Sequence, residues 1–63
     1  MFCIKWRDTE KEYTFHSLAF SHVYAYAEAR KAEGFKVTFY EYIGRGLGKI
    51  AEEDIEFLRR RSA

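Results

Sequence analysis

Proline is absent from this chain, and Cys3 is its one cysteine. A single cysteine excludes a disulfide within the chain, and no spacing of cysteine and histidine resembles a zinc site. A domain of 63 residues is small, and domains of this size bury only roughly 60% of their unfolded surface. Aromatic packing or a partner must therefore supply the stability that disulfides or metals supply in other small domains.

A strong net charge and a long apolar run are missing too. The chain has 11 lysines and arginines against 10 aspartates and glutamates, for a net charge of +1. Domains that bind duplex DNA usually carry a larger basic excess, so a nucleic-acid partner has to be argued from local arrangement. No segment approaches the roughly 20 apolar residues of a membrane span, and the N-terminus has no signal-peptide core. We therefore expect a cytoplasmic protein without a membrane partner and with a reduced Cys3.

The residues that are present predict a folded domain. Aromatic residues make up 19% of the chain and charged residues 33%, which is typical of folded domains and not of disordered tails. We expect a single domain over residues 1–63.

Two segments near the N-terminus alternate between apolar and polar side chains, which is the two-residue period of a strand with one buried face. Their apolar positions are Phe2, Ile4, Trp6, Tyr13 and Phe15. Residues 8–11 form a polar break between the two segments. The pattern predicts a β-hairpin.

A long helix is predicted from Ser17, a candidate N-cap, to about Glu33, because alanine recurs and no proline interrupts it. Gly34 is well placed as its left-handed C-cap. Two stripes at helical spacing compete for the buried face. The first contains Phe20, Val23, Tyr24 and Ala27, and the second contains Ala19, Val23, Tyr26 and Arg30. We favour the first stripe, which leaves Tyr26 and His22 toward solvent.

Residues 34–43 predict a third strand, in which Phe35, Val37 and Phe39 alternate with polar side chains. A glycine-rich segment over residues 44–49 predicts a flexible turn. A short C-terminal helix from about residue 52 to residue 60 follows, and its acidic first turn and basic last turn suit the helix dipole.

These elements predict an α+β fold in the order strand, strand, helix, strand, helix. A right-handed crossover places the third strand beside the first and gives a three-stranded antiparallel sheet of order 2-1-3. The long helix packs on one face of the sheet, and the other face is open. The open face is expected to carry Cys3, Lys5, Arg7, Glu12, Thr14, His16, Lys36, Thr38, Tyr40 and Tyr42.

Motifs for catalysis or nucleotide binding are not met. A P-loop requires a glycine where Ile43 stands and a serine or threonine where Ile50 stands. The third glycine comes one residue too early for the dinucleotide fingerprint. Cys3 and His16 share the predicted open face, but no third orienting residue or oxyanion donor accompanies them. We predict no enzyme, no cofactor, no metal site and no small-molecule substrate.

Tyrosines and cations remain outside the predicted core, and tyrosine and arginine are enriched in protein interfaces. The predicted partner-binding residues are Lys5, Arg7, Tyr26, Lys36, Tyr40, Tyr42, Arg59 and Arg60. We expect non-catalytic binding of another protein, either a foreign target or a second copy of the chain in a homodimer. The alternative is single-stranded nucleic acid, whose bases stack on aromatic rings and whose phosphates pair with cations.

The order of a hairpin, a helix ending in Gly-Phe-Lys-Val and a third strand, over residues 2–43, resembles that of small bacteriophage accessory proteins. Proteins of that kind inhibit a host enzyme or defence complex. The resemblance implies a stoichiometric inhibitor that acts in the host cytoplasm, and it assigns no role to any residue.

Overall fold

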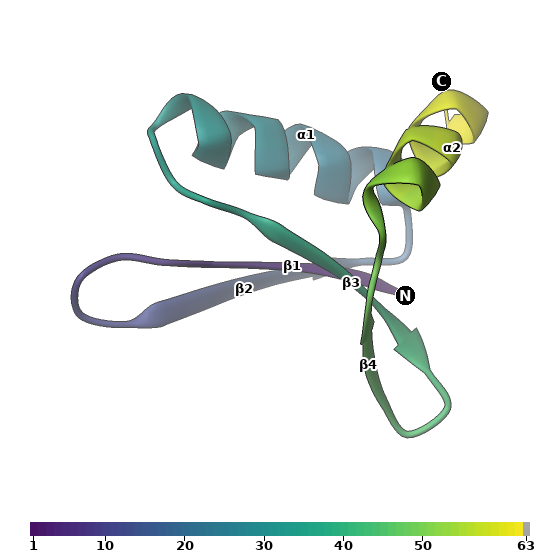
Figure 1. The fold of residues 1–63 in the computed structure, drawn as a ribbon, viewed down its shortest axis with the longest axis horizontal. Coiled ribbons are helices and arrows are strands. Elements are labelled where there is room, and N and C mark those ends of the chain that lie inside the picture. Colours follow the sequence, from purple (N-terminus) through teal and green to yellow (C-terminus); the bar gives the residue numbers. More distant parts are fainter. Residues whose placement is uncertain (63) are drawn as a thin grey trace.

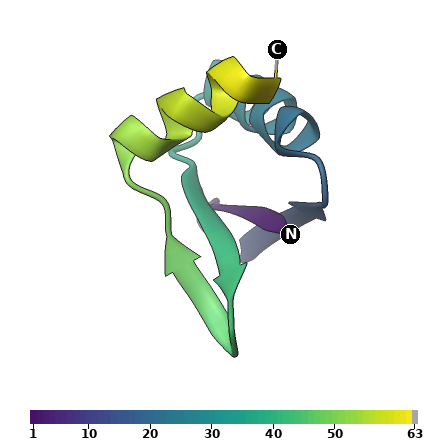
Figure 2. The same ribbon diagram turned by 90° about the vertical axis from the view of Figure 1, so that its right-hand side faces the viewer.

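The computed structural model describes residues 1–62 and has an α+β fold with one antiparallel sheet and two helices (Figure 1). The elements are β1 (Phe2–Arg7), β2 (Glu12–Ser17), α1 (Phe20–Ala32), β3 (Thr38–Ile43), β4 (Gly46–Lys49) and α2 (Glu52–Ser62). The strands lie in the order β2-β1-β3-β4. Both helices lie on the same side of the sheet, which leaves its other face open (Figure 2). Within residues 1–62, neither helix has the length and apolar composition to cross a membrane.

Strand β1 lies between β2 and β3, as the sequence predicted. It pairs antiparallel with β2 along its whole length and with β3 from Phe2 to Lys5. Ile4 is opposite Phe15 on one side and Phe39 on the other. The predicted hairpin and the predicted 2-1-3 arrangement are confirmed for these three strands.

The prediction of only three strands is wrong, because part of the glycine-rich segment forms β4. This strand pairs antiparallel with β3, from Tyr40 opposite Lys49 to Ile43 opposite Gly46. The hairpin turns at Gly44, which has a φ of +57°, a conformation that favours glycine. Glycine has no side chain, so β4 shows little of the alternation that identified the other strands. The observed order is therefore strand, strand, helix, strand, strand, helix.

Helix α1 begins later than predicted. Ser17 is the last residue of β2, and its Oγ accepts a hydrogen bond of 3.2 Å from the backbone N–H of Ala19, which is the residue at the N-cap. The predicted end of the helix is confirmed. Gly34 has a φ of +98°, and the next backbone N–H, from Phe35, donates to the carbonyl of Arg30 at 3.1 Å, which is the Schellman arrangement.

The predicted third strand loses its first residues to this helix cap. Because the N–H of Phe35 is bonded to α1, the chain enters the sheet only at Thr38. Phe35 and Val37 nevertheless pack against the core, as their alternation predicted.

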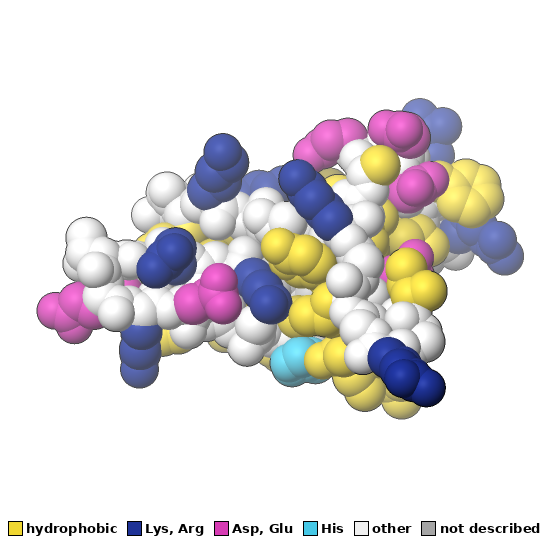
Figure 3. Space-filling view, turned by 60° about the horizontal axis from the view of Figure 1, so that its bottom comes forward, with side chains coloured by type: hydrophobic (Ala, Val, Ile, Leu, Met, Phe, Trp, Pro, Cys, Tyr) yellow, Lys and Arg dark blue, Asp and Glu magenta, His cyan; other side chains and the backbone are white. Residues whose placement is uncertain are grey.

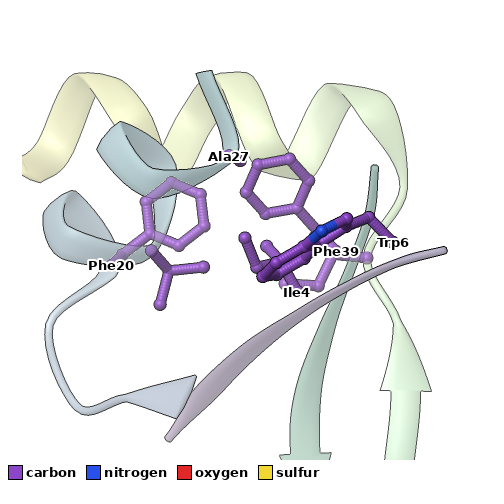
Figure 4. Close-up of a cluster of buried hydrophobic side chains, with 7 residues drawn as sticks. Ile4, Trp6, Phe20, Ala27 and Phe39 are labelled. Carbon is purple, nitrogen blue, oxygen red and sulfur yellow. The ribbon is translucent and has the colours of Figure 1, made fainter. Parts of the chain in front are cut away.

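The core lies between the sheet and the two helices (Figure 4). Its buried members are Ile4, Trp6, Phe20, Val23, Ala27, Phe39 and Ile50. The first of the two helical stripes is therefore the buried one, with Tyr24 half-buried at its border. Ile50 directly follows β4, and its N–H donates to the carbonyl of Phe39 at 2.9 Å, which ties the chain leading into α2 to the centre of the core.

The turn between β1 and β2 is organised by one side chain, Asp8. Its Oδ1 accepts hydrogen bonds from the backbone N–H groups of Glu10 and Lys11, at 2.8 and 2.9 Å. Its Oδ2 accepts one from the hydroxyl of Tyr13 at 2.9 Å. These hydrogen bonds hold the pKa of Asp8 below its ordinary value of 3.8, and the two from the backbone have the largest effect.

Replacing Phe39 with alanine is expected to lower the free energy of unfolding by about 3–5 kcal/mol, because it removes a buried ring and leaves a cavity. Phe39 contacts Phe20 and Tyr24, at centroid distances of 5.8 and 6.2 Å. Urea unfolding followed by circular dichroism measures the change. The Phe57→Ala variant, altered at an exposed ring on α2, is the control and should unfold close to wild type.

Asp8 is expected to make the hairpin less stable in acid. The pKa of Asp8 is lower in the folded chain than in the unfolded chain, so the unfolded chain binds a proton at this carboxyl more readily. The stabilisation that ionised Asp8 provides is present above pH 3.8 and is lost as the pH falls through the folded pKa. The Asp8→Ala variant should therefore lose less stability than wild type as pH is lowered below about 5. Thermal unfolding across this range tests the claim, with Glu10→Ala as control. Equal acid sensitivity of wild type and Asp8→Ala would contradict it.

Candidate binding surface on the open face of the sheet

The open face of the sheet is defined here by the strand residues that point away from the helices, together with Lys36. It consists of Cys3, Lys5, Arg7, Glu12, Thr14, His16, Lys36, Thr38, Tyr40, Tyr42, Leu47 and Lys49. Cations are spread across this side of the molecule, with hydrophobic side chains between and beside them (Figure 3). Five of the eight predicted partner-binding residues lie here.

Four of those five line one open depression in the face. Lys5 and Arg7 reach it from β1, Tyr40 comes from β3, and Lys36 comes from the segment that precedes β3. The ammonium of Lys5 lies 5.3 Å from the centroid of the Tyr40 ring, within the range of a cation–π contact. Glu12, Trp6 and Thr38 line it too, so the depression combines three cations and one carboxylate with two aromatic residues.

The charge of this face differs from that of the whole chain. Its cations are Lys5, Arg7, Lys36 and Lys49, and its one carboxylate is Glu12. The whole chain has a net charge of only +1, so the remaining surface is net negative. The face thus favours an anionic partner even though the composition does not.

At one end of the face, the side chains of His16 and Tyr42 bridge the central strand. The Tyr42 hydroxyl lies 3.0 Å from His16 Nδ1, and the two rings stack with centroids 5.7 Å apart. His16 belongs to β2 and Tyr42 to β3, so the pair spans β1 beside Cys3, which has 0% exposure. Burial raises the pKa of the Cys3 thiol above its ordinary value of 9.0, against a smaller lowering effect of Lys5.

An exposed apolar pair continues the face beyond this bridge. Tyr42 is 44% exposed and lies opposite Leu47, which is 36% exposed. Lys49 lies opposite Tyr40 on the same strand as Leu47. The sequence prediction missed both β4 residues because it placed them in a flexible turn. The only signal was the alternation of Leu47 and Lys49 with glycine.

The other three predicted residues lie on the helix side and do not join the open face. Tyr26 is 38% exposed but stacks on Phe15, with centroids 4.2 Å apart and planes 4° apart. Arg59 and Arg60 both bond to Glu56 within α2, and the hydrogen bond from Arg59 lowers the pKa of Glu56. The eight residues therefore divide between two sides of the molecule.

The open face shows no arrangement suited to metal or nucleophilic chemistry among residues 1–62. The described part of the chain contains no group of three or more His, Cys, Asp or Glu side chains placed to hold a metal ion. Cys3 and His16 are neighbours in the β1–β2 ladder. The raised thiol pKa favours the protonated form of Cys3, whereas a reactive cysteine is a thiolate.

No protein-family model, curated protein or solved structure matches this chain.

Cys3 is expected to react slowly with a thiol reagent in the native protein, because it is buried and its thiol pKa is raised. Tyr42→Phe should speed the reaction by about fivefold, since a net hydrogen bond of about 1 kcal/mol to His16 is lost. Tyr42→Ala should speed it further because the ring is lost too. Absorbance with Ellman's reagent measures these rates. Three equal rates would show that the bridge does not protect the thiol.

Proposed function

We propose that this protein is a non-catalytic binding protein that acts through a protein–protein interface on the open face of the sheet. The observation that supports this most is the exposure of Tyr42 and Leu47 on the same open face as Lys5, Arg7, Lys36 and Lys49, a face that no other element of residues 1–62 covers. Interfaces combine aromatic anchors with a polar rim, and binding energy concentrates in few residues. Tyr42, Leu47 and Tyr40 supply the anchors.

The charge of the face defines the kind of protein partner. Lys5, Arg7 and Lys36 lie together at one end, and Lys49 lies opposite Tyr40. A partner with an acidic patch beside an apolar groove is complementary to this arrangement. The mechanism is then steric, since the bound domain covers the surface of its target. Inhibition of a host enzyme by a bacteriophage protein, suggested by the order of elements, is one form of this mechanism and remains a proposal.

Replacing Tyr40 and Tyr42 together with alanine is expected to weaken binding by at least about 30-fold, or about 2 kcal/mol, as for other interface anchors. The test is capture from a nuclease-treated lysate of the source cell, followed by titration of the captured protein. Phe57→Ala is the matched control, because Phe57 is also an exposed ring but lies on α2. A partner that binds the double variant as tightly as wild type would refute the proposed surface. Circular dichroism must show that the double variant is folded.

Single-stranded nucleic acid is a second candidate, supported by the depression that Lys5, Arg7, Lys36 and Tyr40 line together with Glu12. Cations along a groove pair with phosphates, and aromatic rings stack with bases irrespective of sequence. The small number of cations argues for weak binding, in which each cation that pairs with a phosphate contributes roughly 0.7 to the slope of log affinity against log salt.

A labelled single-stranded oligonucleotide separates the two candidates. If nucleic acid is the partner, fluorescence anisotropy rises at low salt, the affinity falls as salt is added, and Lys5→Ala makes the slope of log affinity against log salt shallower by about one. Absence of binding at low salt would leave the protein partner as the sole proposal for this face.

A further inference from the structure

Strand β2 forms an edge of the sheet that can pair with a strand of another chain. It has six residues, pairs with β1 in continuous register, and contains neither proline nor glycine. Among residues 1–62 no other strand pairs with it. Natural sheets protect such edges with proline, bulges, charges or a very short strand, because unpaired backbone groups attract another strand.

The opposite edge is protected in this way. Strand β4 has four residues, and Gly46 and Gly48 occupy half of its positions. A short strand rich in glycine offers few cross-strand side-chain contacts and pairs weakly with an incoming strand. The two edges therefore differ, and β2 is the one suited to a partner strand.

The order of side chains in β2 is self-complementary. If two copies of β2 pair antiparallel with Thr14 opposite Thr14, Glu12 lies opposite His16 and Tyr13 lies opposite Phe15. Directly opposed residues share a face of the sheet, so each of these pairs is in contact. An aromatic pair and a threonine pair are favourable cross-strand neighbours, and the third pair brings no like charges together.

Aromatic side chains at this edge are left incompletely covered within one chain. Tyr13 and Phe15 are only half-buried, although they lie on the face that packs against α1. Tyr26 stacks on Phe15 and is itself 38% exposed. A second copy at the β2 edge brings another Tyr13 and Phe15 alongside them and covers more of this aromatic surface.

We propose that two copies of the chain associate through antiparallel pairing of their β2 strands, with Thr14 at the two-fold axis. The pairing joins the two four-stranded sheets into one continuous sheet. The axis is perpendicular to the sheet, so the helices of both copies lie on one side and both open faces lie on the other. The proposal concerns a different surface from the open-face interface, and either can fail without the other.

Sedimentation of the intact protein tests the association. Wild type is expected to show about twice the 7.5 kDa mass of the chain at concentrations of tens of micromolar, an order common for small interfaces. In Thr14→Glu the new carboxylate lies opposite Lys5 within the chain. Across the two-fold axis it lies opposite the same carboxylate of the second copy, and the two like charges repel. This variant should be folded and monomeric.

Thr38→Glu is the matched control, because Thr38 also lies opposite Lys5 but on the inner strand β3. It introduces the same charge beside the same lysine and should remain dimeric. If wild type is still monomeric at about 100 micromolar, its dissociation constant is weaker than that of common small interfaces. That result would overturn the proposal. So would a Thr14→Glu variant that dimerises as wild type does.

A cysteine placed at the axis tests the register. Opposed residues in an antiparallel pair have Cα atoms about 4.5–5.5 Å apart, within the range of a disulfide. Thr14→Cys should therefore form a covalent dimer on mild oxidation, seen by non-reducing electrophoresis, while buried Cys3 stays unreacted. Thr9→Cys, in the exposed turn, should not. Equal cross-linking of the two variants would refute this register.

Discussion

The pairing of β1 with β3 is the interaction on which the rest of the structure depends. Each of these strands also belongs to a local hairpin, β1 with β2 and β3 with β4. Within residues 1–62, the β1–β3 ladder alone joins the hairpins into one sheet. It also places Ile4 beside Phe39, where both side chains meet α1 and exclude water from the centre of a small core.

The same ladder creates the open face. Because side chains alternate along each strand, fixing Ile4 and Phe39 toward the helices fixes Lys5 and Tyr40 away from them. Stability and the candidate surface are therefore set by one register. A shift of that register by one residue on either strand exchanges the two sets of side chains, so the core itself keeps the cations and tyrosines on one side.

The sequence predicted the parts of the fold in which side chains alternate or recur at helical spacing. Strands β1 and β2 and the buried stripe with Phe20 and Val23 follow from such patterns, and the end of α1 follows from Gly34. Strand β4 was not predicted, because half of its positions are glycine and carry no side chain to show a two-residue period. The start of β3 was misplaced for another reason. The N–H of Phe35 bonds to the end of α1 and not to a neighbouring strand, and which bond it makes depends on backbone geometry.

The candidate surface was predictable to the extent that it depends on alternation. Lys5, Arg7 and Tyr40 were assigned to one face by their strand positions, and they meet in one depression. Tyr26 was selected because the favoured helical stripe left it toward solvent, and Arg59 because it belongs to the basic last turn of the C-terminal helix. Stacking on Phe15 and bonding to Glu56 place them on the helix side. Leu47 and Lys49 needed the fourth strand, so the sequence prediction did not include them.

The β1–β3 ladder also affects how the chain folds during synthesis. Its partners closest in sequence, Lys5 and Thr38, are separated by the whole of β2 and α1. A hairpin forms in about 1–10 μs, but ribosomes add only about 5–20 residues per second, so β1 waits on the order of seconds for β3. During that interval the second edge of β1 is unpaired and Trp6 has no complete core around it. The nascent chain is therefore most prone to mispairing before β3 is made, and the speed of translation through α1 sets how long that period lasts.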